Sequence, residues 1–332
     1  MPSSPAPRLK RRFSRWAAAL IIVVVLVAAL AYLIKDPSPV GYWRSAAGQD
    51  AYRAAYAEAM TKLPAPDAIL DIRTDYGIVR VYRFDARSGG QQTPVVLVPG
   101  IRSGTPMWQA NLPLLQRERT VFALDALGDA GLSIQDRPIR TPQDQANWLD
   151  QTLAGLGIER AHVVGHSFGG WAAANFAARF PRRIASLSLL EPVYVWEGLP
   201  ASTIAKSIPA ALPFLPKAWR DAMLADFGGA TTSDLDDPVA RMIDAGMANY
   251  RSALPAQPEL ITGEQLSGLP VYLALAPRSV MHDAQSVADK AKASTPGIEV
   301  QIWPDTSHSL PMEVPGPLND RLLAFMSAHD QR

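Results

Sequence analysis

The fold is decided by Gly165-His166-Ser167-Phe168-Gly169, together with what lies on either side of it. The apolar run 161–164 precedes this stretch, and the alanine-rich run 171–178 follows it. This order predicts a strand, a sharp turn and a helix, with the serine held on a strained backbone at the carboxyl edge of a sheet. The flanking glycines allow neighbouring elements to pack closely against the turn. An exposed hydroxyl in this position suits a nucleophile.

A serine hydroxyl becomes a good nucleophile only when a base accepts its proton, so a histidine is expected after a later strand. His308 fits, because it follows the strand-like run 299–303 and the turn residues 304–307, and it precedes the apolar run 318–326. The other four histidines fit less well. His162 lies inside a strand, His166 lies beside the serine, His282 precedes a helix cap, and His329 lies in the tail. We therefore predict that His308 is the base.

These motifs occur in the order of the α/β-hydrolase family, which the chain resembles over residues 67–329. Residues 93–100 predict a buried strand that ends in Pro99-Gly100, where many relatives carry His-Gly. The loop 126–133 resembles the family's Asp-x-x-Gly-x-Gly-x-Ser loop with one residue inserted. The resemblance implies an α/β fold with a mostly parallel, eight-stranded sheet flanked by helices, and a helical cap between strands six and seven.

The hydrophobic pattern predicts elements consistent with that fold. Alternation over 68–73 and 78–84 predicts an antiparallel hairpin. Apolar runs that alternate with helices predict parallel strands covered on both faces; they lie near 95–98, 121–125, 161–164, 184–190, 271–276 and 299–303. Residues 46–62 carry apolar side chains at helical spacing, which predicts a helix packed on the outside of the domain or a stalk.

Residues 17–34 contain no charged residue, and as a helix they would reach roughly 27 Å at 1.5 Å per residue. Five basic residues precede them, with no acidic residue before Asp36: Arg8, Lys10, Arg11, Arg12 and Arg15. The pattern predicts a single-pass membrane anchor with a cytoplasmic amino terminus and the catalytic domain outside the cytoplasm. A secretory signal cleaved after residues 29–31 is the alternative; we favour the anchor because the apolar run continues past that site.

The predicted organisation has six parts: a cytoplasmic basic tail (1–16), the anchor (17–34), a juxtamembrane segment and helix (35–66), the first part of the hydrolase core (67–191), the cap (192–268) and the second part of the core (269–332). A net charge of +1, without a basic cluster in the catalytic region, argues against a nucleic-acid partner. Cysteine is absent, which excludes disulfides and thiolate chemistry. The oligomeric state has no signature in the sequence.

The base needs a carboxylate to hold its tautomer, and several acidic residues compete for this role. In many relatives the acid follows the seventh strand, but Ser279 stands at that position, and Asp283 comes four residues later at a predicted helix start. Glu191 ends the sixth strand at the carboxyl edge of the sheet, where some relatives place their acid. We favour Glu191, keep Asp283 as the alternative, and rank Asp305 third.

The oxyanion formed at the substrate carbonyl needs two oriented backbone amides. Phe168 supplies one by its position, and the resemblance implies that Ile101 supplies the other. Apolar cap residues either line an acyl pocket or fill the cap's own core; they are Trp196, Leu199, Phe214, Leu215, Trp219, Met223, Phe227, Met242 and Met247.

The sequence therefore predicts a membrane-anchored serine hydrolase that cleaves carboxylic esters through an acyl-enzyme, with an ester or other small acyl compound as substrate. The mechanism needs no metal and no cofactor. A haloperoxidase or a carbon–carbon bond hydrolase would use the same serine relay. A catalytically silent binding module of this fold is the alternative from another class, and the presence of Ser167 and His308 argues against it.

Overall fold

The computed structural model describes residues 38–330 except 90–91, 212–216, 229–236 and 255–257, and before residue 38 it describes only residues 18 and 20–22. The chain divides into two compact units, Met1–Pro39 and Val40–Arg332. The predicted anchor, residues 17–34, lies outside the described residues except for residues 18 and 20–22. Within the described part, no helix is long and apolar enough to cross a membrane.

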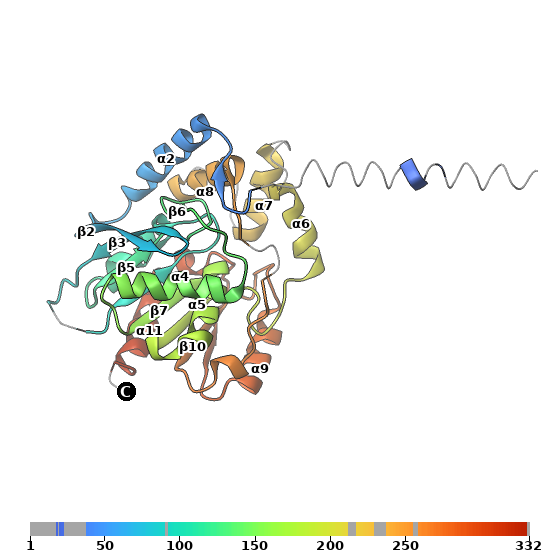
Figure 1. The fold of residues 1–332 in the computed structure, drawn as a ribbon. Coiled ribbons are helices and arrows are strands. Elements are labelled where there is room, and N and C mark those ends of the chain that lie inside the picture. Colours follow the sequence, from blue (N-terminus) through green and yellow to red (C-terminus); the bar gives the residue numbers. More distant parts are fainter. Residues whose placement is uncertain are drawn as a thin grey trace, which may run out of the picture. The chain divides into compact units, whose positions relative to one another are not determined.

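The second unit is built on one central sheet, whose main path runs in the order β11-β10-β8-β7-β4-β5-β3-β2 (Figure 1). These strands are β2 (Ala68–Thr74), β3 (Gly77–Phe84), β4 (Val95–Val98), β5 (Val121–Leu124), β7 (Ala161–His166), β8 (Ile184–Leu190), β10 (Val271–Leu275) and β11 (Glu299–Ile302). The pairs β2–β3 and β3–β5 are antiparallel, and the pairs from β5 to β11 are parallel. The predicted α/β-hydrolase sheet is confirmed.

A ninth, two-residue strand that the sequence did not indicate, β6 (Ile134–Gln135), pairs with the start of β3. It is too short to show a period of its own, and it forms because the loop after β5 returns alongside β3.

Helices cover both faces of this sheet, which explains why its inner strands are largely apolar in sequence. Every residue of β4, β5, β7, β8 and β10 is buried. One apolar cluster joins the sheet to α4 (Pro142–Gly155), α5 (Phe168–Arg179) and α9 (Ala284–Ser294). The other joins it to α2 (Ala46–Met60), α3 (Leu112–Leu115) and α11 (Pro315–Ser327).

The helix predicted over 46–62 is α2, and it packs against α8 (Pro238–Asn249). Tyr52 and Tyr56 of its apolar stripe are buried, while Arg53 and Glu58 are exposed. The Tyr56 hydroxyl donates to Asp125 Oδ1 at 3.0 Å, at the end of β5. The segments before α2 and after α8 are joined further by the short antiparallel pair of β1 (Tyr42–Trp43) and β9 (Tyr250–Arg251).

The segment between β8 and β10 interrupts the alternation of strands and helices, in the region predicted as a cap. It contains α6 (Ala201–Ala211), α7 (Lys217–Gly228) and α8 (Figure 1), followed by β9. α6 packs against α7, and α8 packs against α2. Phe227, Val239 and Ile243 of this segment line the cavity that is described below.

Candidate active site

Ser167 lies in the sharp turn between β7 and α5. Its backbone has φ 55 and ψ −122, a left-handed conformation that is rare for a residue with a side chain. The flanking glycines are required by space: a Cβ on Gly165 would lie 2.3 Å from the Gly169 carbonyl oxygen, and a Cβ on Gly169 would lie 2.2 Å from the Pro99 carbonyl oxygen. The close packing of strand, turn and helix holds the serine at the edge of the sheet.

His308 lies in the loop after β11, and its ring reaches Ser167. The distance from His308 Nε2 to Ser167 Oγ is 2.8 Å. The His308 carbonyl accepts a hydrogen bond at 2.8 Å from Nε2 of His166, a residue for which no sequence pattern suggested a role. Burial lowers the pKa of His308 to about 4, which keeps the imidazole neutral and able to accept a proton.

Glu191 follows β8 and is fully buried. Its Oε2 lies 3.2 Å from His308 Nδ1, and its Oε1 accepts the Ala276 amide at 2.6 Å. Because the carboxylate can only accept a hydrogen bond, Nδ1 carries the proton and Nε2 is left as the acceptor for the Ser167 hydroxyl. Ser167, His308 and Glu191 therefore form one hydrogen-bonded chain across the carboxyl edge of the sheet.

The other acidic candidates make local contacts of their own. Asp283 is the N-cap of α9, and its carboxylate accepts the Ser286 amide at 2.8 Å. Asp305 occupies a turn with φ 58, and its carbonyl accepts a hydrogen bond from Arg278. The structure thus brings Glu191 to the histidine, and it places Asp283 and Asp305 in local structural roles.

A second histidine lies beside the carboxylate, and no sequence pattern indicated it. His282 Nε2 lies 3.4 Å from Glu191 Oε1, and both side chains are buried. Burial raises the pKa of Glu191, while His282, the Ser279 hydroxyl and the Ala276 amide oppose that rise by stabilising the anion. Ser279, at the family's usual acid position, therefore lies near the carboxylate of Glu191 and lowers its pKa.

Two backbone amides near Ser167 in the structure are those predicted as oxyanion donors. The Phe168 amide is the first of α5, where a helix leaves its N–H groups without internal partners and carries positive potential. Ile101 follows Gly100 in the loop after β4 and lines the same cavity as Ser167. Within the described part of the chain, neither the Phe168 amide nor the Ile101 amide has a hydrogen-bond acceptor.

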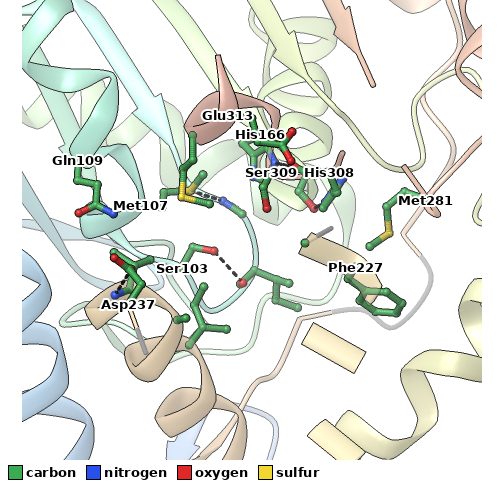
Figure 2. Close-up of a pocket in the computed structure, with 18 residues that line it drawn as sticks. Ser103, Met107, Gln109, His166, Phe227, Asp237, Met281, His308, Ser309 and Glu313 are labelled. Atoms are coloured by element: carbon green, nitrogen blue, oxygen red, sulfur yellow. Dashed lines mark hydrogen bonds between the residues drawn. The ribbon is translucent and has the colours of Figure 1, made fainter. Parts of the chain in front are cut away.

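The cavity has a volume of about 530 Å³, and Ser167 and His308 both line it. In Figure 2, His308 lies between Met107 on one side and Met281 on the other. Other residues from the loops and from the segment between β8 and β10 complete the lining; they include Phe227, Asp237, Val239, Ile243, Met312 and Glu313. Among the described lining residues none is a lysine or an arginine.

Phe227 is the one candidate from the predicted acyl pocket that lines this cavity in the described part of the chain. Trp196, Met242 and Met247 are buried in packing positions, and the Trp196 indole donates to Thr295 at 3.0 Å. Leu199 packs against the apolar cluster on the α5 side of the sheet. Phe214 and Leu215 lie outside the described residues, as do the side chains of Trp219 and Met223. The sequence alone did not indicate which of these apolar residues face the cavity.

A second Ser–His–Asp array has similar distances and a different environment. His162 Nδ1 lies 2.8 Å from Ser186 Oγ, and His162 Nε2 lies 3.1 Å from Asp330 Oδ1. Ser186 and His162 are fully buried, and Asp330 is also paired with the buried Arg119. This array ties the carboxyl-terminal segment to the sheet, and its serine has no access to a substrate.

Comparisons with known proteins agree with this architecture. The family model described as "Alpha/beta hydrolase family" matches residues 95–321. The chain is 27% identical over 295 residues to the uncharacterized carboxylesterase nap of Bacillus subtilis (83% of this chain, 92% of that protein), and 26% identical over 293 residues to carboxylesterase YbfK of the same species (82% and 92%).

The crystal structure of naproxen esterase (carboxylesterase NP) from Bacillus subtilis has the same fold. It superposes with a TM-score of 0.77 at 24% identity, over 85% of this chain and 99% of that one. The strand order, the serine turn between β7 and α5, and the extent of the family match lead to one conclusion. The chain belongs to the alpha/beta hydrolase family.

Proposed function

We propose that this protein is a serine esterase that hydrolyses carboxylic esters through an acyl-enzyme. The observation that carries the proposal is the chain of hydrogen bonds from Ser167 Oγ to His308 Nε2 (2.8 Å) and from His308 Nδ1 to Glu191 Oε2 (3.2 Å). The carboxylesterase relatives, which match 83% and 82% of this chain, support the same reaction class.

The proposed reaction has two halves. In the first, Ser167 Oγ attacks the ester carbonyl while His308 Nε2 takes its proton, and Glu191 stabilises the imidazolium. The Ile101 and Phe168 amides donate to the oxyanion. Collapse of the tetrahedral intermediate expels the alcohol, which leaves with the proton from His308. In the second half, His308 deprotonates water, the hydroxide attacks the acyl carbon, and the proton returns to Ser167 as the acid leaves.

The cavity supports a neutral, largely apolar ester as substrate. Met107, Phe227 and Met281 supply apolar surface beside the serine. The two carboxylates in the lining, Asp237 and Glu313, are bound to backbone amides of Val239 and Ser307. With no described lysine or arginine in the lining, the cavity offers no charge partner for an anionic acyl group.

The test uses the complete protein with a short-chain aryl ester and a fluorophosphonate probe. We expect release of the alcohol and covalent labelling of Ser167. A folded protein that is neither labelled nor active on a panel of esters would contradict the proposal and favour a binding role. Labelling of Ser167 without ester cleavage would instead indicate that the same residues catalyse another reaction, such as that of a haloperoxidase or a carbon–carbon bond hydrolase.

The pH dependence of kcat/KM follows from the surroundings of His308. Glu191 faces Nδ1, the His166 ring lies 4.9 Å away between ring centroids, and His282 faces the other oxygen of Glu191. The base must be neutral, and burial lowers its pKa from 6.5 to about 4, so activity is present above that pKa and is lost as pH falls through it.

We therefore expect the acid limb of kcat/KM for a neutral ester to have its midpoint below pH 6.5. Circular dichroism at each pH separates titration of the site from acid unfolding. An acid midpoint above the ordinary histidine pKa in folded enzyme would contradict this expectation, because it would mean that the charge of Glu191 outweighs the burial of His308.

We also propose that residues 17–34 anchor the enzyme in a membrane, with residues 1–16 in the cytoplasm. The uncharged run and the basic residues before it support this topology. We expect the full chain to remain with membranes after an alkaline carbonate wash, and a chain that starts at residue 35 to be released. Full-length protein in the soluble fraction would contradict the anchor, and a soluble form lacking residues 1–31 would indicate a cleaved signal.

A further inference from the structure

The loop after β4 carries one of the two proposed oxyanion donors, and several of its backbone groups are hydrogen-bonded. The Gly100 amide donates to Met107 Sδ at 3.2 Å, and the Gly100 carbonyl accepts the Ser103 amide at 3.2 Å. The Ile101 carbonyl accepts the Ser103 hydroxyl, also at 3.2 Å. The Ile101 amide is left without an acceptor in the described structure, so it is available to a ligand in the cavity.

The next amide along the chain is bound by a carboxylate from another loop. The Arg102 amide donates to Asp129 Oδ2 at 2.5 Å. Asp129 is only 3% exposed, and burial raises its pKa, while the Arg102 guanidinium and amide oppose that rise. The backbone of Arg102 has φ 61, a left-handed conformation that is unfavourable for a residue with a side chain. The buried carboxylate of Asp129 thus binds the strained backbone of Arg102, one residue after the oxyanion donor.

A second carboxylate, Asp125 at the end of β5, binds the same loop farther along the chain than Asp129 does. Its Oδ1 accepts the Thr105 amide at 2.8 Å and the Tyr56 hydroxyl at 3.0 Å. Its Oδ2 accepts the Leu132 amide at 2.7 Å. The two carboxylates therefore have different roles, because Asp125 joins the loop to the core while Asp129 binds the peptide next to the donor.

We propose that Asp129 is a positioning residue of the oxyanion hole. The Ile101–Arg102 peptide is planar, with its carbonyl bound by Ser103 and its N–H bound by Asp129. These two contacts fix the plane of that peptide, and the Gly100 carbonyl, which accepts the Ser103 amide, restrains the preceding peptide that carries the Ile101 N–H. Together they hold the backbone on both sides of the Ile101 Cα and so set the direction of the Ile101 amide. Without the carboxylate, Arg102 relaxes from its left-handed conformation and the Ile101 N–H turns away from the substrate oxygen. The inference rests on the proposed esterase function.

The test compares two substrates in Asp129→Ala and Asp129→Asn. One is an aryl ester, and the other is its thionoester, in which sulfur replaces the carbonyl oxygen and accepts hydrogen bonds poorly. We expect Asp129→Ala to lower kcat on the ester by about 10- to 100-fold with little change in KM. The ratio of kcat on the ester to kcat on the thionoester should fall as well, because a misaligned amide no longer favours oxygen. Asp129→Asn retains a side-chain oxygen that can accept the Arg102 amide, so its kcat on the ester and its substrate ratio should fall less.

Asp144→Ala is the matched control, because Asp144 caps α4 through Thr141 and lies in an exposed capping box. It should lower the melting temperature and leave both kcat and the substrate ratio unchanged. If Asp129→Ala does not fold, Asp129→Asn alone decides the outcome.

A folded Asp129 variant with the wild-type substrate ratio would overturn the positioning role while leaving the esterase intact. Wild-type protein without ester hydrolysis or labelling at Ser167 would instead overturn the proposed function, and this inference with it.

Discussion

Ser167→Ala is expected to lower kcat/KM for an aryl ester by about 10⁵- to 10⁶-fold and to abolish fluorophosphonate labelling. The hydroxyl is the atom that forms the acyl-enzyme, and in the structure its side-chain hydrogen bond goes to His308 Nε2 at 2.8 Å. The substitution removes only the hydroxyl group and leaves the apolar packing around the turn unchanged. The melting temperature should therefore change little, and the loss of activity will report on chemistry.

His308→Ala provides the control for this result. Because the serine and the histidine act as a unit, the double variant should be no less active than either single variant. Residual hydrolysis above about 1% of the wild-type rate in purified Ser167→Ala would mean that another group attacks the ester. The assignment of the nucleophile would then be wrong.

Glu191→Gln is expected to lower kcat by about 10⁴-fold, the second largest effect. The carboxylate accepts from His308 Nδ1 and so leaves Nε2 free to take the serine proton. A glutamine can present its amide N–H to Nδ1 instead, which moves the ring proton to Nε2 and blocks the base. The fully buried Glu191 also loses its charge next to the imidazolium that forms in the transition state.

Asp283→Asn is the matched isosteric control. Asp283 caps α9 through the Ser286 amide, and asparagine is an equally good N-cap, so the free energy of unfolding should change by less than about 0.5 kcal/mol. Stopped-flow or steady-state ester hydrolysis, with thermal unfolding of both variants, distinguishes the two residues. Full activity in Glu191→Gln together with an inactive Asp283→Asn would reverse the assignment of the acid.

The strands and the two central site residues were predictable because their signals are local. Each inner strand is a short, mostly apolar run, and Ser167 stands in a five-residue motif between one such run and a helix. His308 was found by its place after the last strand. The structure brings these two residues together across 141 positions of sequence. By contrast, β6 has two residues, which is too few to show a period.

Choosing among the acidic residues required more than a pattern. Glu191 and Asp283 both lie near the ends of predicted elements, and both are compatible with a structural or a chemical role. The pairing of β8 with β10 favours Glu191, since it carries this residue to the Ala276 amide and to His308. From sequence alone the choice was a preference, because strand neighbours far apart in the chain are not encoded in local periodicity.

The sequence by itself determined the class of fold, the order of its strands along the chain, and the serine turn, because hydrophobic period and glycine spacing are properties of neighbouring residues. Only the tertiary structure decided which carboxylate lies against His308, that His282 lies beside that carboxylate, and that Asp129 binds the loop of Ile101. It also decided which apolar residues line the cavity. These are contacts between separate loops at one edge of the sheet, and their partners are fixed by how the strands pair and how the helices pack on them.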